Sequence, residues 1–422
     1  GIYFLRNGSQ HVEKTEVECG VFSMISDKLQ SITWVGTDCN GLLRWDKFAT
    51  EINCITFQSL PYNIDMPVRS IYLDKERSLW FGTKGKGLYR LRDFSTTAAF
   101  DKSDVDRFTV SNSELTYNSV YSITESCHDI LWIGNGGSGL NWYSYSKDRI
   151  GKVTGGERLK RIHAIIEQND STLWIGTDSE GAYRCRFTIR NDNPIITRID
   201  TLQFIAPFNS RTSIFSMSLQ NDNKIWFSSR GQGALEYDIR TGTSRVIQFP
   251  NENGYATNAI CHIAQTDDLL FATGNGAVIY DCTSGSMHLS ENVPQKAIHA
   301  IVKDVNGNIW ISTNSGIISL DETYGYRTAF DRMSSMEVLE YSDGACWLDK
   351  ESNTVFFGGI NGITTIREQE DGEYYNYDYK PAIHITNFIQ NNEKSHIQDK
   401  LSKGRLKLPH SRSIFGIEFL VV

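Results

Sequence analysis

A short segment that starts with tryptophan and continues with glycine and threonine recurs along this chain at nearly constant spacing. The copies begin at Trp34, Trp80, Trp132, Trp174 and Trp226, with weaker ones at Phe271, Trp310 and Phe356. Seven intervals separate residue 34 from residue 356, so the mean period is 46 residues. A period of about 20–50 residues is typical of propellers and solenoids. The chain is therefore predicted to repeat one supersecondary unit.

Each copy lies between two other strand-like segments. Around Trp80 the order is Val68–Asp74, a polar turn, Leu79–Thr83 and then Gly87–Leu91. A weaker fourth segment, such as Arg107–Val110, follows in most units. Four antiparallel strands in about 40–45 residues make the blade of a β-propeller. The predicted fold class is all-β, a β-propeller of four-stranded antiparallel blades, seven favoured and eight possible, followed by a truncated β-sandwich-like segment.

The recurring tryptophans and glycines are expected to serve the scaffold. Each tryptophan should pack between adjacent blades, where a large aromatic side chain buries most of its surface. The glycines at 82, 134 and 176 should let neighbouring blades approach closely, since a glycine carries no Cβ.

Composition excludes several function classes. A formal charge of −8 disfavours a nucleic-acid binder, which needs a basic surface. The eight cysteines form no CxxC pair and show no paired metal-ligand spacing, so we expect no metal and no cofactor, and most cysteines should be small buried apolar residues, with one or two disulfides possible. No apolar run reaches the roughly 20 residues of a membrane-spanning helix, so no membrane segment is expected in this chain.

The repeat pattern also suggests boundaries. Residues 1–17 resemble the end of a repeat, so we expect a partial leading repeat cut from a longer protein, followed by propeller repeats over 18–369. An acidic, tyrosine-rich connector covers 370–381, and 382–422 alternate as strands but are too few for a complete sandwich of about 100 residues. With seven blades favoured, the copy between Trp34 and Phe57 would be an extra unit.

Two stretches carry a family resemblance. Leu131–Leu140 and Leu173–Ala182 fit the pattern Leu-Trp-Ile-Gly-Thr-x-x-x-Gly-Leu, which resembles the two-component-regulator propeller repeat. The resemblance implies the periplasmic sensor region of a hybrid two-component histidine kinase, in which tandem propellers precede an immunoglobulin-like domain. Residues 381–422 resemble the start of that domain, and a homodimer is expected for the full-length protein. Any kinase activity would lie outside this chain.

Candidate ligand residues come from two variable positions of the repeat. In a propeller the first strand of each blade lines the axis, and its beginning shares a face with the loop between the second and third strands. Residues whose chemistry changes at a fixed structural position suit a binding rim. The candidates on the first strands are Arg69, Tyr121, His163, Phe215 and His299, with Cys261 as a further member; those on the loops are Lys84, Lys86, Asn135, Asp178, Arg230 and Asn314.

Three functions fit this pattern. Aromatic and cationic neighbours suit a sugar bearing a carboxylate or sulfate, which favours a non-catalytic sensor that binds an oligosaccharide from polysaccharide breakdown. A lyase or hydrolase could instead use Arg69, Tyr121 and His163 on a uronate. A protein-interaction propeller is the third reading. No His-x-His pair, His-x-x-x-His pair or carboxylate pair accompanies His163 and His299, so they are expected to be packed or lining residues rather than metal ligands or catalytic bases.

Overall fold

The computed structural model divides the chain into two compact units, one of Thr50–Glu370 and one of residues 1–49 with 371–422. It describes residues 3–5, 12–14, 19–27, 32–38, 41–46, 50–95, 100–191, 193–229, 231–247, 249, 257–263, 266–331, 336–368, 383–390, 393–396, 401–402, 405–406 and 415–421. None of the described helices is long and apolar enough to span a membrane.

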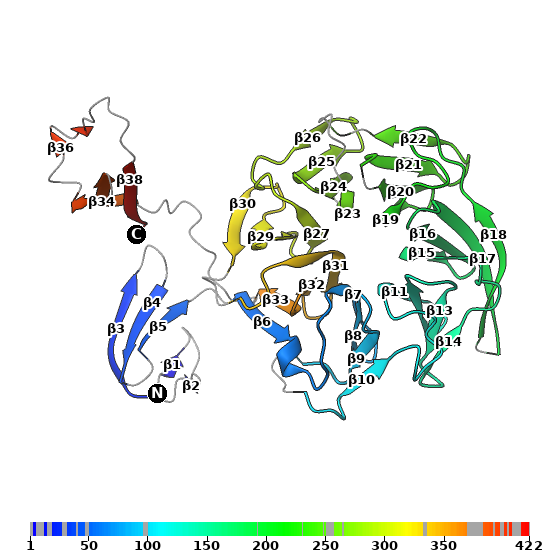
Figure 1. Ribbon diagram of the computed structural model, residues 1–422, viewed down its shortest axis with the longest axis horizontal. Helices are drawn as coiled ribbons and strands as arrows, with labels where there is room; N and C mark the ends of the chain where they lie inside the picture. Colours follow the sequence, from blue (N-terminus) through cyan, green and yellow to red (C-terminus); the bar gives the residue numbers. More distant parts are fainter. Residues whose placement is uncertain are drawn as a thin grey trace. The chain divides into compact units, whose positions relative to one another are not determined.

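Thr50–Glu370 is a ring of seven four-stranded antiparallel sheets, which confirms the predicted fold class (Figure 1). The first six blades are, from the inner strand outward, β7 (Val68–Leu73), β8 (Leu79–Thr83), β9 (Leu88–Leu91) and β10 (Val105–Phe108); β11 (Val120–Glu125), β12 (Ile130–Asn135), β13 (Asn141–Ser144) and β14 (Arg149–Lys152); β15 (Ile162–Asn169), β16 (Thr172–Thr177), β17 (Ala182–Arg190) and β18 (Asn193–Thr201); β19 (Ile214–Asn221), β20 (Lys224–Ser229), β21 (Ala234–Asp238) and β22 (Ser244–Ile247); β23 (Thr257–Ile263), β24 (Asp268–Thr273), β25 (Gly276–Asp281) and β26 (Met287–Leu289); and β27 (Ile298–Lys303), β28 (Ile309–Thr313), β29 (Gly316–Leu320) and β30 (Tyr326–Phe330).

The seventh blade closes the ring with a strand from the start of the unit. Its inner three strands are β31 (Tyr341–Asp349), β32 (Thr354–Gly359) and β33 (Gly362–Glu368), and its outer strand is β6 (Thr50–Thr56). β6 runs antiparallel to β33 from Thr50 opposite Glu368 to Thr56 opposite Gly362. A short 3₁₀ helix, η1 (Phe57–Ser59), follows β6 and leads toward β7. The two ends of the unit are thus held in one sheet.

The motif tryptophans of the ring pack between adjacent blades, as the sequence predicts, but the prediction is wrong for Trp34, which lies on β4 outside the ring and is 39% exposed. Trp80, Trp132, Trp174, Trp226 and Trp310 are each at most 1% exposed. Trp80 belongs to a buried cluster with Val120 and Leu131 of the next blade. Its indole Nε1 donates a hydrogen bond to Asp74 Oδ2 over 2.6 Å, so its polar edge is satisfied as well. One copy is displaced by one residue, because the strand register places Leu270, not Phe271, at the tryptophan position of the fifth blade.

The motif glycines lie where the blades come closest. A Cβ built on Gly82 would stand 2.6 Å from the carbonyl oxygen of Val120 in the next blade, and one on Gly134 would stand 2.6 Å from Ile162 Cγ2. Real Cβ atoms do not approach other atoms so closely, so only glycine permits this blade spacing.

The second unit contains β1 (Tyr3–Leu5), β2 (Val12–Lys14), β3 (Val21–Asp27), β4 (Ile32–Thr37), β5 (Leu42–Asp46), β34 (Ile383–Gln390), β35 (Glu393–His396), β36 (Leu401–Ser402), β37 (Arg405–Leu406) and β38 (Phe415–Val421). Its sheets have the orders β3-β4-β5 and β35-β34-β38, with the hairpins β1-β2 and β36-β37. The division at Thr50 differs from the predicted propeller start at residue 18, because β3 to β5 pair only with one another while β6 joins the last blade. The predicted connector lies outside the described residues, and an immunoglobulin-like tail stays a prediction.

Adding one methyl group at a blade contact should destabilise the ring. In Gly82→Ala the new Cβ would meet Ser70 Oγ at 2.4 Å and Val120 at 2.6–2.7 Å, so blades one and two must separate. We expect a loss of about 1–3 kcal/mol, typical of overpacking, measured as a lower Tm or denaturant midpoint. The matched control is Gly274→Ala, whose Cβ meets no atom within 4 Å and should change stability by less than about 0.5 kcal/mol. Equal effects of the two substitutions would contradict this account of blade spacing.

Candidate functional site

The innermost strand of each blade contains a β-bulge near its start. In the first blade Val68 pairs with Thr83 and Ser70 with Gly82, which leaves Arg69 without a residue opposite it. The same irregularity recurs in the following blades, and the residues it skips are Arg69, Tyr121, His163, Phe215, Asn258 and His299. In β31 the irregularity is longer and runs from Tyr341 to Cys346. A bulge bends a strand and re-aims a side chain, so each blade presents one residue at the axis.

Two cavities at the axis share side chains from this bulge set. The inner one has a volume of about 310 Å³ and is lined by Arg69, Tyr121, His163, Phe215, Asn258 and Asp343. The outer one, of about 530 Å³, is lined by loop residues together with Tyr121 and His163. We call the two together the axial site.

One side of the axial site is a continuous run of stacked groups. The Arg69 guanidinium carbon lies 5.7 Å from the ring centre of Tyr121. The rings of Tyr121 and His163 stack at 4.2 Å with planes 14° apart, and His163 meets Phe215 edge to face at 4.7 Å. Such contacts each stabilise by about 0.5–1.5 kcal/mol, so these four side chains hold one another in place.

Arg69 retains hydrogen-bonding capacity within this packed run. Its Nε is buried and has no hydrogen-bond partner, and its nearest carboxylate, Asp343 Oδ2, is 4.0 Å from Nη2. A buried donor without a partner costs about 1–3 kcal/mol. A ligand that brings an acceptor to Arg69 would recover this free energy, which marks the guanidinium as a recognition group.

Asp343, which lines the inner cavity near Arg69, belongs to a hydrogen-bonded triad with His299 and Asn314. Asp343 Oδ1 lies 2.6 Å from His299 Nδ1, and His299 Nε2 lies 2.5 Å from Asn314 Oδ1. Burial disfavours the charged imidazole and Arg69 opposes it, but the hydrogen bonds to Asp343 and Asn314 and the charge of Asp343 outweigh both, so the pKa of His299 is raised. The structure thus places two predicted residues, His299 from a first strand and Asn314 from a loop, in one hydrogen-bonded network.

Charged residues surround the mouth. Lys84 and Arg161 are exposed and line the outer cavity with Asp178. Asp178 accepts hydrogen bonds from Ser213 at 2.6 Å and from Ser179 at 3.0 Å. Burial raises the pKa of this carboxyl, but the two hydroxyls and the nearby His163 and Arg161 lower it by more, so it lies below its usual range. The mouth therefore carries both signs of charge.

Besides His299 and Asn314, which line neither cavity themselves, two more predicted residues lie outside the axial site. Asn135 is fully buried, and its amide nitrogen donates to Thr116 Oγ1 and Asn141 Oδ1, so it supports the loop and does not face the axial site. Lys86 lines neither cavity and pairs with Asp65 at 2.9 Å. Arg230 falls outside the described residues.

The structure adds residues that the pattern did not indicate. The sequence pattern predicts Cys261 on the first strand of the fifth blade at this position. The strand register instead places Asn258, three residues earlier, at the bulge. The small Ala259 that follows Asn258 is the signal that could have located it. Asp343 lies in the longer irregularity of β31, where no copy of the usual pattern exists. Within the described part of the chain, no three His, Cys, Asp or Glu side chains are placed to hold a metal ion. Six described cysteines, Cys54, Cys127, Cys185, Cys261, Cys282 and Cys346, are free thiols.

A family model for the two-component regulator propeller matches residues 292–315, which include β27 and the tryptophan of β28. Residues 292–315 thus match one copy of the two-component-regulator propeller repeat. A curated relative, histidine kinase P4 of Formosa agariphila, is 22% identical over 409 residues, which is 90% of this chain and 28% of that protein.

Solved structures share the fold around this repeat. The extracellular domain of a putative hybrid two-component system from B. thetaiotaomicron has a TM-score of 0.63 and 18% identity. The alignment covers 95% of this chain and 52% of that chain. A second such domain from the same organism has a TM-score of 0.60 and 17% identity over 95% of this chain and 54% of its own. Virginiamycin B lyase from Staphylococcus aureus has a TM-score of 0.57 and 15% identity, and covers 76% of this chain and 100% of its own. The chain thus spans about half of the first two solved chains.

The contacts of His299 predict its titration. We expect its imidazole to titrate at a pKa above the ordinary histidine value and to move down in Asp343→Asn, since the substitution removes the charge that favours the imidazolium. Because the pKa of His299 is raised in the folded state, its protonated imidazole stabilises the fold. This contribution to the free energy of unfolding is complete below the pKa of the unfolded state, about 6.5, and is lost as pH rises through the pKa of the folded state. NMR titration of the imidazole protons measures the pKa of His299 in the original protein and in Asp343→Asn. A pKa unchanged by the substitution would refute the coupling between His299 and Asp343.

Proposed function

We propose that this chain is the ligand-sensing part of an extracytoplasmic sensor in a hybrid two-component signalling protein, and that it binds an oligosaccharide from polysaccharide breakdown in the axial site. The repeat, the kinase relative and the fold shared with extracellular sensor domains support this role. The observation that carries it is Arg69, whose buried Nε lacks a partner and which lines a cavity together with aromatic and amide groups.

The two sides of the axial site suit a sugar that bears an acidic group. Arg69 would pair with a carboxylate or sulfate through charge-assisted hydrogen bonds. The faces of Tyr121 are already met by Arg69 and His163, so a sugar would reach these rings chiefly at their polar edges. Asn258 and Asp343 line the cavity on the polar side and could bind hydroxyl groups.

We further propose that binding is not followed by turnover, and that the domain works in the periplasm as part of a homodimer. The bound sugar would stabilise the arrangement of the central strands that contact it, so that ligand binding and the conformation of the ring are linked. A lyase reading has a structural counterpart in virginiamycin B lyase, but the likeness is one of fold.

Binding should depend on Arg69 and Tyr121. Calorimetry of the 422-residue protein against neutral, uronate-bearing and sulfated oligosaccharides should give the tightest binding with an acidic sugar. Arg69→Gln should weaken that binding about 10- to 100-fold, the loss expected for a charge-assisted hydrogen bond. Arg198→Gln is the control, since Arg198 lies on β18, is 71% exposed and pairs with Asp200.

Two outcomes would count against the proposal. Equal loss of affinity in Arg69→Gln and Arg198→Gln would remove the axial site as the place of binding. New reducing or unsaturated ends after incubation with the bound sugar would favour the lyase or hydrolase reading instead.

A further inference from the structure

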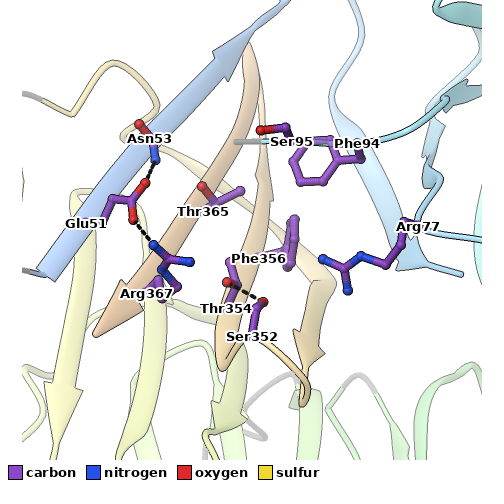
Figure 2. Close-up of a pocket in the computed structure, with 10 residues that line it drawn as sticks. All are labelled: Glu51, Asn53, Arg77, Phe94, Ser95, Ser352, Thr354, Phe356, Thr365 and Arg367. Carbon is purple, nitrogen blue, oxygen red and sulfur yellow. Dashed lines mark hydrogen bonds and ion pairs between the residues drawn. The ribbon is translucent and has the colours of Figure 1, made fainter. Parts of the chain in front are cut away.

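A third cavity lies at the seam where the ring closes, away from the axial site. It has a volume of about 180 Å³ and lies between the seventh blade and Arg77, Phe94 and Ser95 of the first blade. Figure 2 shows Thr365 between the Glu51–Asn53 pair on one side and Phe94 and Phe356 on the other. We call this cavity the seam site.

At one row of positions the seventh blade carries smaller side chains than the first blade, and the seam site lies beside this row. Strand pairing places Trp80, Arg90 and Asp106 in this row in the first blade. The corresponding residues in the seventh blade are Phe356, Thr365 and Asn53. Residues directly opposite one another on paired strands point to the same face, so each row lies on one side of its sheet.

In the first and sixth blades this row is filled. Arg90 packs over Trp80 at 5.2 Å and its Nη1 donates to Tyr143 of the next blade at 2.5 Å. In the sixth blade the row contains the small Ser319, but Arg327 from β30 fills the space and donates to Ser319 Oγ at 3.2 Å and to Glu368 at 2.7 Å. The void at the seam is thus a departure from a packing pattern that the ring follows elsewhere, in a fold whose interiors are normally close-packed.

The walls of the seam site are polar but close to electrically balanced. The Arg367 guanidinium donates to Glu51 at 2.7 Å, and Arg77 donates to Asp349 at 2.7 Å. The Asn53 amide also donates to Glu51, at 3.0 Å. Since both cations already have carboxylate partners, the site offers an anion little net attraction, whereas its amide, carboxylate and guanidinium groups can exchange hydrogen bonds with hydroxyl groups.

The remaining walls combine hydroxyl and aromatic groups. Thr354 and Ser352 place two hydroxyls 2.7 Å apart, and Thr365, which is 1% exposed, adds a third. The rings of Phe94 and Phe356, 5.7 Å apart and tilted by 54°, form the apolar wall and are 8% and 1% exposed. A volume of 180 Å³ would hold about six waters at liquid density, which is enough for one sugar ring and too little for a chain of them.

We propose that the seam site binds one neutral sugar or cyclic polyol ring, with its hydroxyls on the half-buried Asn53 and Glu51 and its C–H groups toward Phe94, next to the buried Phe356 and Thr365. Such a ligand would contact β6, β32 and β33 together with the first blade. It would therefore stabilise the closure of the ring directly, independently of what binds at the axial site.

The test uses the 422-residue protein with D-glucose, D-galactose and D-xylose, and with D-glucuronate as the charged comparison. At least one neutral sugar should show saturation-transfer NMR signals and raise Tm by a few degrees at saturation. Phe356→Trp should abolish both effects, because it installs the side chain that five other blades carry and fills the cavity. Thr365→Val, which keeps the shape of the side chain and removes the hydroxyl, should weaken binding about tenfold.

A variant of the axial site separates this proposal from the sensor function. Tyr121→Ala should leave the monosaccharide response unchanged, since Tyr121 does not line the seam. The proposal is overturned if none of the neutral sugars binds, if D-glucuronate alone binds, if the response persists in Phe356→Trp, or if it disappears in Tyr121→Ala.

Discussion

The whole propeller depends on the contact between one sheet and the next. A single four-stranded blade of this chain has two apolar faces and cannot bury either of them alone. The motif tryptophans fill the space between blades and the glycines let the backbones approach, so the same few residues recur wherever two sheets meet. Closure by β6 extends this packing to the last interface, where Phe356 shares a buried cluster with Val68 and Ile71 of the first blade.

The same construction explains why the axial site can vary while the ring stays constant. The bulge residue of each inner strand is outside the pairing pattern, so its identity is not constrained by the partner strand. One blade can place arginine there, the next tyrosine, and the next histidine, with little effect on how the sheets pack. Recognition at the axis and stability between the blades therefore rest on different positions of one repeat.

This separation determines how far sequence reasoning reaches. Trp80 and Gly82 could be assigned to the scaffold because packing demands the same chemistry in every unit. Arg69, Tyr121 and His163 could be placed at the axis because they occupy a fixed position in a clear repeat. Asn135 was misjudged because its neighbours Thr116 and Asn141, which saturate its amide, come from different segments. Asp343 and the outer strand β6 escaped prediction because neither belongs to a copy of the motif, and both owe their place to pairing across the ring.

The position of β6 also bears on how the protein is made. Arg367 reaches Glu51 across 316 positions of the chain, so the strand that completes the last blade leaves the ribosome long before its partner exists. Until β33 is synthesised, β6 remains an unpaired strand with hydrogen-bonding edges, and the other six blades form a row with two open ends. Such long-range pairing slows folding and prolongs the exposure of sheet edges. For a ring of this kind, closure has to wait until the seventh blade has been synthesised.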